Sequence, residues 1–179
     1  MKSPWTIKST KLVYNNPWIS VREDQVITPS GTDGIYGVVH LKGYALGIVA
    51  LDAEQNIYLV GQYRYPLEKY SWELPEGGGD LKAPPLESAK RELREETGLI
   101  AKEWEYLCKY HPSNSITDEV GFLYLATDLV QGEMDLDETE DIKVKKLPFV
   151  EALRMVEREE ITDLISITGI YAVARKLGV

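Results

Sequence analysis

The chain has 179 residues, of which 44% are hydrophobic and 27% charged, and its formal net charge is −9. This length predicts one domain, or one domain with a small appendage, and the composition excludes extended disorder. The longest mainly apolar run, residues 44–51, is far shorter than the roughly 20 residues of a membrane helix. Residues 1–5 lack the apolar core of a signal peptide, so we expect no membrane partner.

The negative charge and the cysteine content narrow the partners and the location. An acidic chain is a poor electrostatic partner for nucleic acid, and it would need a divalent metal ion to host a polyanionic substrate. Cys108 is the single cysteine, so it forms neither an internal disulfide nor a thiolate metal site by itself. We therefore expect no nucleic-acid partner and a reducing, cytoplasmic location.

The first half of the chain is typical of strands and turns. Segments rich in β-branched and aromatic residues predict strands at 5–14, 18–28, 35–41, 46–51 and 57–65. Residues 29–34 form a turn cluster, and residues 53–56 predict a hairpin connection. A short apolar-polar stretch at 71–75 precedes Gly77, Gly78 and Gly79, which predict a loop with unusual backbone freedom.

The second half alternates helices with strands. Two prolines open a predicted helix at 86–97, which Gly98 ends, and its apolar stripe (Leu86, Ala89, Leu93) should pack on a sheet. Strands are predicted at 104–110, 120–127 and 143–147, an acidic loop at 132–141, and helices at 151–159 and 164–177. This order predicts a layered α+β domain.

The helix at 86–97 carries the strongest chemical signal. Glu92, Glu95 and Glu96 lie at i, i+3 and i+4, which places three carboxylates on one face, expected opposite the apolar stripe. Like charges at this spacing repel by about 0.2–0.5 kcal/mol per pair, and a hard cation such as Mg²⁺ or Mn²⁺ would reverse that penalty. A solvated charged helix face would explain the same spacing.

The residues around these glutamates resemble the Nudix box. Gly77 stands at the right distance before Arg91-Glu92-Leu93, Glu95-Glu96 and Gly98-Leu99, which match the second half of that box completely. The resemblance covers most of the chain. It implies an α/β/α sandwich with a mixed sheet over residues 43–179, and hydrolysis of a nucleoside diphosphate linked to another moiety. It also implies Mg²⁺ or Mn²⁺ held by the box glutamates.

One box position departs from the pattern, because Ala83 stands where the first glutamate is expected. We hypothesise that Glu87, four residues before Arg91, replaces it by holding that arginine. The gap leaves open a non-catalytic, Nudix-like domain that only binds its nucleotide.

Three segments resemble the branch that contains ADP-ribose pyrophosphatases and nucleotide-sugar hydrolases. Residues 72–77 are similar to the branch's approach to the box, which implies that the main-chain oxygen of Glu76 is a metal ligand. Residues 111–119, with Pro112, are similar to its substrate loop. Residues 137–142 are similar to the acidic loop that brings a glutamate to the attacking water.

The resemblance assigns roles residue by residue. Glu138 is the predicted general base, with Glu140 and Glu119 as alternatives, and Arg91 and Glu95 complete the catalytic set. The predicted metal ligands are Glu76, Glu92, Glu95, Glu96 and Glu140, and the predicted substrate contacts are Arg64, Trp18 and Glu119.

The same branch suggests substrates and assembly. It implies a small-molecule nucleotide sugar, with ADP-ribose and GDP-mannose leading, that yields a nucleoside monophosphate and a sugar phosphate. Dinucleoside polyphosphates and coenzyme A remain alternative substrates. Members are commonly homodimers, so residues 1–42 are expected to form a dimer-forming β arm.

Overall fold

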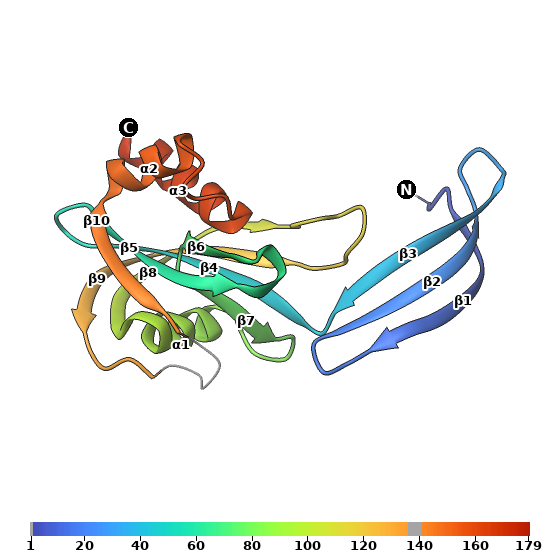
Figure 1. Ribbon diagram of the computed structural model, residues 1–179, viewed down its shortest axis with the longest axis horizontal. Coiled ribbons are helices and arrows are strands. Elements are labelled where there is room, and N and C mark those ends of the chain that lie inside the picture. Colours follow the sequence, from blue (N-terminus) through green and yellow to red (C-terminus); the bar gives the residue numbers. More distant parts are fainter. Residues whose placement is uncertain (1, 136–140) are drawn as a thin grey trace.

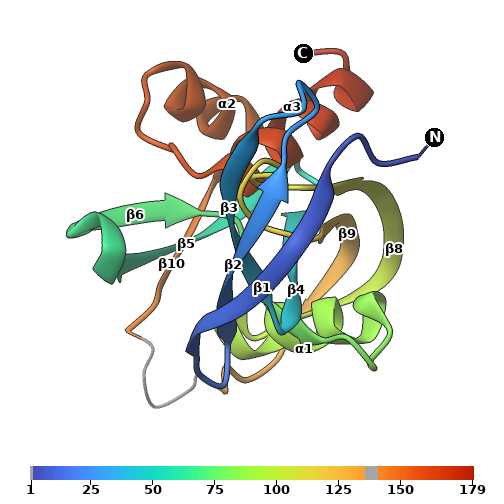
Figure 2. The ribbon, with the colours of Figure 1, turned by 90° about the vertical axis from the view of Figure 1, so that its right-hand side faces the viewer.

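The computed structural model describes residues 2–135 and 141–179 as an α+β structure with two sheets (Figure 1). The first sheet is an antiparallel ribbon in the order β1-β2-β3, made by β1 (Thr6–Asn15), β2 (Ile19–Ile27) and β3 (Asp33–Leu41). We call this sheet the arm, because it extends away from the rest of the molecule (Figures 1 and 2). No helix in the described part of the chain is long and apolar enough to cross a membrane.

The second sheet forms the body of the molecule. Its strands are β4 (Gly43–Leu51), β5 (Asn56–Arg64), β6 (Lys69–Glu73), β7 (Glu76–Asp80), β8 (Leu99–Tyr110), β9 (Gly121–Gln131) and β10 (Lys143–Pro148). The order is β10-β5-β4-β9-β8, with β6 paired to β5 and β7 paired to β4. The sheet is mixed because β4 and β9 run parallel while the other pairs are antiparallel.

Helices cover both faces of this sheet (Figure 1). On one face, α1 (Pro85–Thr97) buries Ala89 and Leu93 against β4, and it ends at Gly98, whose positive φ of 71° suits glycine. On the other face, α2 (Phe149–Glu157) and α3 (Leu164–Leu177) pack with Phe149 and Ile170 in a second core. A short 3₁₀ turn, η1 (Tyr65–Leu67), joins β5 to β6. The expected α/β/α layering is confirmed.

The three consecutive glycines form part of a strand, so the predicted loop is wrong. Gly77, Gly78 and Gly79 lie in β7 and pair with β4. A Cβ at Gly77 would overlap the carboxyl group of Glu92, and one at Gly79 would overlap the Tyr44 ring. These glycines therefore allow close approach between β7 and its neighbours, rather than a special backbone conformation.

The loop between β8 and β9 connects the body to the arm. The Val39 N–H of β3 donates to the Ile116 carbonyl at 2.9 Å, and the Tyr36 hydroxyl donates to the Ser115 carbonyl at 2.7 Å. His40 Nδ1 lies 2.5 Å from Asp118 Oδ2. The arm and this loop thus reach the same side of the body, where a cavity of about 810 Å³ opens.

Candidate active site

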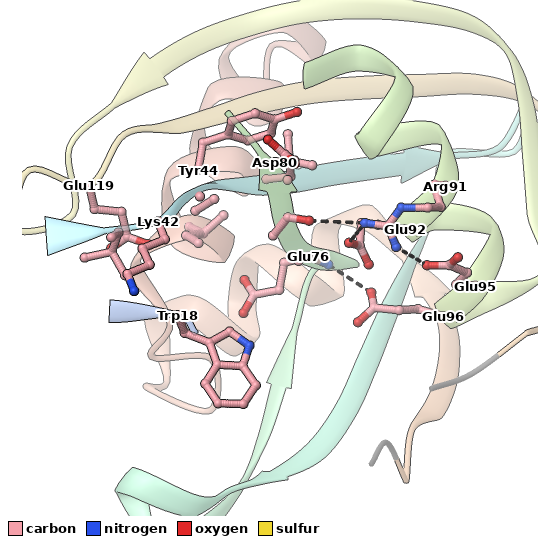
Figure 3. A pocket seen from close by; sticks show the side chains of 18 of the residues that line it. Trp18, Lys42, Tyr44, Glu76, Asp80, Arg91, Glu92, Glu95, Glu96 and Glu119 are labelled. Atoms are coloured by element: carbon pink, nitrogen blue, oxygen red, sulfur yellow. Dashed lines mark hydrogen bonds and ion pairs between the residues drawn. The ribbon is translucent and has the colours of Figure 1, made fainter. Parts of the chain in front are cut away.

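A cavity of about 810 Å³ lies between α1, β7 and the base of the arm. It brings together residues that are far apart in sequence, and all the predicted site residues that the structure describes line it. These residues are Trp18, Arg64, Glu76, Arg91, Glu92, Glu95, Glu96 and Glu119. In Figure 3 the glutamates of α1 lie on one side of the cavity, and Trp18 and Glu119 lie on the other.

The carboxylates of α1 adjoin the apolar stripe, so their expected place on the opposite face is wrong. Glu96 is 1% exposed and Glu92 is 7% exposed, whereas Glu95 is half-buried. Residues 89, 93 and 96 follow each other at i, i+4 and i+7, which places Glu96 on the same helix face as the core residues. Glu92 and Glu96 thus point into the body and do not belong to the solvated charged face of the helix.

Arg91 holds two of these glutamates. Its guanidinium lies 2.5 Å from Glu92 Oε1, forms an ion pair with Glu95, and donates to the Gly78 carbonyl at 3.1 Å (Figure 3). Burial would lower the pKa of Arg91, but Glu92 and Glu95 outweigh it and raise that pKa. Arg91 is therefore a fixed positive charge that positions the carboxylates.

The hypothesis that Glu87 holds this arginine is wrong. The exposed Glu87 carboxylate accepts instead from Lys90 Nζ at 2.8 Å. Ala83 contributes a backbone contact instead, because its carbonyl accepts a hydrogen bond from the Tyr44 hydroxyl at 2.9 Å.

Glu76 links β7 to both sides of the cavity. Its N–H donates to Glu96 Oε2 at 2.9 Å, and its carboxyl group forms an ion pair with Arg64. Burial, followed by the charges of Asp163 and Glu73, raises the pKa of Glu76 well above its ordinary value. Glu76 thus brings a carboxyl group to the cavity, in addition to the main-chain oxygen that the resemblance identifies as a metal ligand.

Arg64 is bound between two carboxyl groups. Its Nε donates to Glu73 Oε2 at 2.9 Å, and its terminal nitrogen contacts both Glu73 and Glu76. Glu73 is 3% exposed, so this ion pair is buried on the carboxylate side. Sequence reasoning missed Glu73, although it belongs to the 72–77 segment. Its signal was a charge between the apolar residues Trp72 and Leu74.

The opposite wall is formed by the arm and the β8–β9 loop. Trp18 is 74% exposed and offers its indole to the cavity. Glu119 lies near the end of this loop. Burial, and secondly the charge of Asp118, raise the pKa of its carboxyl group. The Glu119 carbonyl lies 2.9 Å from His111 Nδ1, which fixes the backbone there.

Four other polar lining residues were not predicted: Lys42, Tyr44, Gln62 and Asp80. Tyr44 shares a hydrogen bond of 2.9 Å with Ser88 on α1. Nothing in the sequence separated Lys42 from other surface lysines, and only the turn between β3 and β4 brings it to the cavity.

The donor groups around α1 suit a hard divalent cation. Glu92, Glu95 and Glu96 are all oxygen donors, and the missing Cβ at Gly77 keeps the β7 backbone against Glu92. Within residues 2–135 and 141–179, no three carboxylate, imidazole or thiol groups converge closely enough to hold a metal ion. Two of these carboxylates, Glu92 and Glu95, are paired with Arg91. The predicted ligand Glu140 and the predicted base Glu138 lie outside the described residues.

Comparison with known proteins decides the family. A model described as the NUDIX domain matches residues 41–167, and one described as the nucleoside diphosphate sugar hydrolase N-terminal domain matches residues 5–39. The chain belongs to the Nudix family. The first match covers the body with α1, and the second covers most of the arm.

Relatives and a solved structure agree with this. An ADP-ribose pyrophosphatase of Mycobacterium tuberculosis is 38% identical over 92% of this chain and 81% of its own. A methanol dehydrogenase activator of Bacillus methanolicus is 34% identical over 88% of this chain and 85% of its own. A crystal structure described as an ADP compounds hydrolase covers 97% of this chain and 94% of its own, with 21% identity and a TM-score of 0.88, which shows the shared fold. The chain is thus a Nudix pyrophosphohydrolase.

Proposed function

We propose that this Nudix protein hydrolyses the diphosphate bond of nucleoside diphosphate sugars with Mg²⁺, releasing a nucleoside monophosphate and a sugar phosphate. The observation that carries the proposal is the convergence of the buried α1 carboxylates, Arg64 and Trp18 on one cavity. The name of the mycobacterial relative supports ADP-ribose as the first substrate to test. GDP-mannose is the second.

Different residues of the cavity would contact different parts of the substrate. Arg64 would contact the diphosphate, and the exposed Trp18 indole would stack on the base. Glu119 would bind the substrate from the opposite wall. Positioning and charge complementarity of this kind supply most of the catalysis in phosphoryl transfer.

The α1 carboxylates would serve the metal. Glu92, Glu95, Glu96, the main-chain oxygen of Glu76 and Glu140 are the proposed ligands, and Arg91 orients Glu92 and Glu95. When bound, Mg²⁺ would neutralise diphosphate charge and lower the pKa of the attacking water. Glu138 is the proposed base that accepts the proton, because a glutamate is ionised at neutral pH.

Chromatography of reaction products tests this function. ADP-ribose, GDP-mannose, UDP-glucose, diadenosine polyphosphate and coenzyme A are incubated with the protein, with Mg²⁺ or with EDTA. We expect nucleoside monophosphate from the sugar conjugates, and none with EDTA. Cleavage confined to coenzyme A or to dinucleoside polyphosphates would move the protein to another Nudix substrate class. Binding without cleavage in Mg²⁺ or Mn²⁺ would indicate a sensor that Ala83 has made inactive.

We also propose that residues 1–42 form a dimerisation arm beside a Nudix domain at 43–179, and that the protein is a cytoplasmic homodimer. The arm supports this because every residue of β1 is exposed, including the hydrophobic Ile7 and Leu12.

A further inference from the structure

A second hollow adjoins the pair formed by Arg64 and Glu76. Its volume is about 330 Å³, and Arg64 and Glu76 line both it and the main cavity. The remaining polar lining comes from Ser71, Glu73, Thr162 and Asp163, where β6 meets the start of α3. We call this hollow the annex.

The annex is rich in carboxyl and hydroxyl groups. Glu73, Glu76 and Asp163 line it, whereas Arg64 is its single lining cation within the part of the chain that the structure describes. That cation is already bound by Glu73 and Glu76. Lys69 reaches the rim, where its Nζ lies 3.5 Å from Thr162 Oγ1. The charge inside is therefore negative, and the hydrogen-bonding groups are those that bind hydroxyls.

One carboxyl oxygen at the wall lacks a partner. Glu76 Oε2 is buried and makes no hydrogen bond within the described residues, while Oε1 contacts Arg64. A buried polar atom without a partner is costly, and a ligand that supplies a hydroxyl would remove that cost. This oxygen belongs to a residue that lines both the annex and the main cavity.

We propose that the annex binds the sugar of the nucleoside diphosphate sugar and disfavours substrates whose second moiety carries a negative charge. This proposal rests on the proposed function. A diphosphate in the main cavity would contact Arg64, and the moiety attached to its far phosphate would continue past that residue. Hydroxyls of a neutral sugar would then reach Glu76 and Asp163, whereas an anionic group would face three carboxyl groups.

Two substrates that differ only in this charge provide the test. UDP-glucose and UDP-glucuronate share base and diphosphate, and differ by a hydroxymethyl or a carboxylate on the sugar. We expect the protein to favour UDP-glucose in kcat/KM by at least about tenfold, because like charges at short range repel strongly inside a protein. We expect Asp163→Asn to reduce this preference at least about threefold, or about 0.65 kcal/mol.

The variants are chosen to separate charge from folding. Asp163 caps α3 by accepting from the Ser166 N–H at 2.7 Å, and asparagine caps helices equally well. Asp128→Asn makes the same chemical change on an exposed residue paired with Lys102, and should leave the preference unchanged. Thr162→Val removes one annex hydroxyl without changing the charge, and should lower kcat/KM for UDP-glucose about threefold while sparing the preference.

Binding of both nucleotides to the Glu96→Gln variant, measured by calorimetry, tests the annex separately from the proposed hydrolysis. Preferential binding of UDP-glucose without any turnover by the native protein would support the annex and contradict the proposed hydrolysis. Hydrolysis of both nucleotides at equal kcat/KM would support the activity and overturn the annex. An unchanged preference in Asp163→Asn would overturn it as well, as would binding of neither nucleotide.

Discussion

Glu96 is a carboxylate at a buried position of the kind that core residues usually occupy. It is 1% exposed and shares a face of α1 with Ala89 and Leu93, yet it accepts the Glu76 N–H at 2.9 Å. Removing a carboxylate from water costs free energy unless hydrogen bonds or a cation compensate. We therefore propose that Glu96 is retained for the chemistry of the cavity and not for stability.

We predict that Glu96→Gln lowers kcat/KM about 100-fold or more while the protein remains folded. Glutamine keeps an oxygen that can accept the Glu76 N–H, but it loses the charge that would bind metal, and losses of this size are typical of metal-site residues. Activity with Mg²⁺ and thermal unfolding followed by circular dichroism measure the two effects. Full activity in this variant would contradict the assignment of the site.

Glu87→Gln on the same helix is the matched control. Glu87 is exposed and paired with Lys90, so this change should alter the free energy of unfolding by less than about 0.5 kcal/mol. It should also leave turnover unchanged. A large loss of activity here would revive the hypothesis that Glu87 supports Arg91.

The sequence predicted which residues line the cavity better than it predicted their contacts. The spacing at 92, 95 and 96 and the family resemblance identified the carboxylates. However, spacing alone could not show that they adjoin the apolar stripe, because only packing against the sheet distinguishes the faces. The partners of Arg64 were also out of reach, since Glu73 meets it only through the pairing of β5 with β6.

At the scale of elements, β7 shows how a strand can form from residues that disfavour strands. Glycine has a low strand propensity, so residues 77–79 predicted a loop. Pairing with β4 and contact with α1 override that propensity, because a larger residue at two of the positions would collide with neighbours. The three helices and the strands other than β6 and β7 were predicted correctly apart from their ends, whereas β6 was expected only as a short apolar-polar stretch.

We predict that Gly79→Ala destabilises the protein by about 1–3 kcal/mol, the usual cost of overpacking. The added methyl group would overlap the ring of Tyr44, whose hydroxyl group shares a hydrogen bond with Ser88 on α1. Gly78→Ala is the control in the same strand, because its methyl group would meet only the Tyr44 carbonyl, at 3.9 Å. Urea unfolding measures both variants. Equal stability of the two would show that close packing does not explain the glycines.

The turn between β4 and β5 provides a pH-dependent prediction. Asp52 accepts from the Asn56 N–H at 2.8 Å and pairs with Lys146 of β10 at 2.6 Å. Burial alone would raise the pKa of Asp52, but the hydrogen bonds from Lys146 and Asn56 outweigh it and lower the pKa from 3.8 to about 2. A lowered pKa means that the ionised group stabilises the fold above pH 4, and that this contribution is lost as the pH falls through 2.

Asp52→Asn should therefore destabilise the protein by about 1–2 kcal/mol at pH 7, and progressively less between pH 4 and pH 2. Urea unfolding of both proteins across this range measures the difference. Glu54→Gln, on the same turn but 3.9 Å from Lys146 and exposed, should show almost no effect. A penalty for Asp52→Asn that is the same at pH 7 and pH 2 would mean that the charge is irrelevant.

At the scale of the whole molecule, the two sheets differ in how they are covered. The body has helices on both faces, whereas none of the helices in the described part of the chain covers the arm (Figures 1 and 2). The arm exposes large hydrophobic side chains, among them Ile7 (58%), Leu12 (62%) and Ile35 (65%). Large exposed hydrophobic side chains that gather on one element can mark an interface, and a second copy of the arm would present the same side chains.

We predict that the protein is a dimer in solution, with a mass about twice the 20.3 kDa of the chain by light scattering after size-exclusion chromatography. The double variant Ile7→Asp, Leu12→Asp should dissociate it, because a self-associating surface would then bury like charges twice. Val179→Asp places the same charge on an exposed hydrophobic residue at the opposite end of the molecule and should leave the dimer intact. A native protein that runs as a monomer would refute the arm's role. A double variant that stays dimeric would place the interface elsewhere.

Because Trp18 lies on this arm and also lines the cavity, the monomeric variant should in addition show a raised KM for its nucleotide substrate.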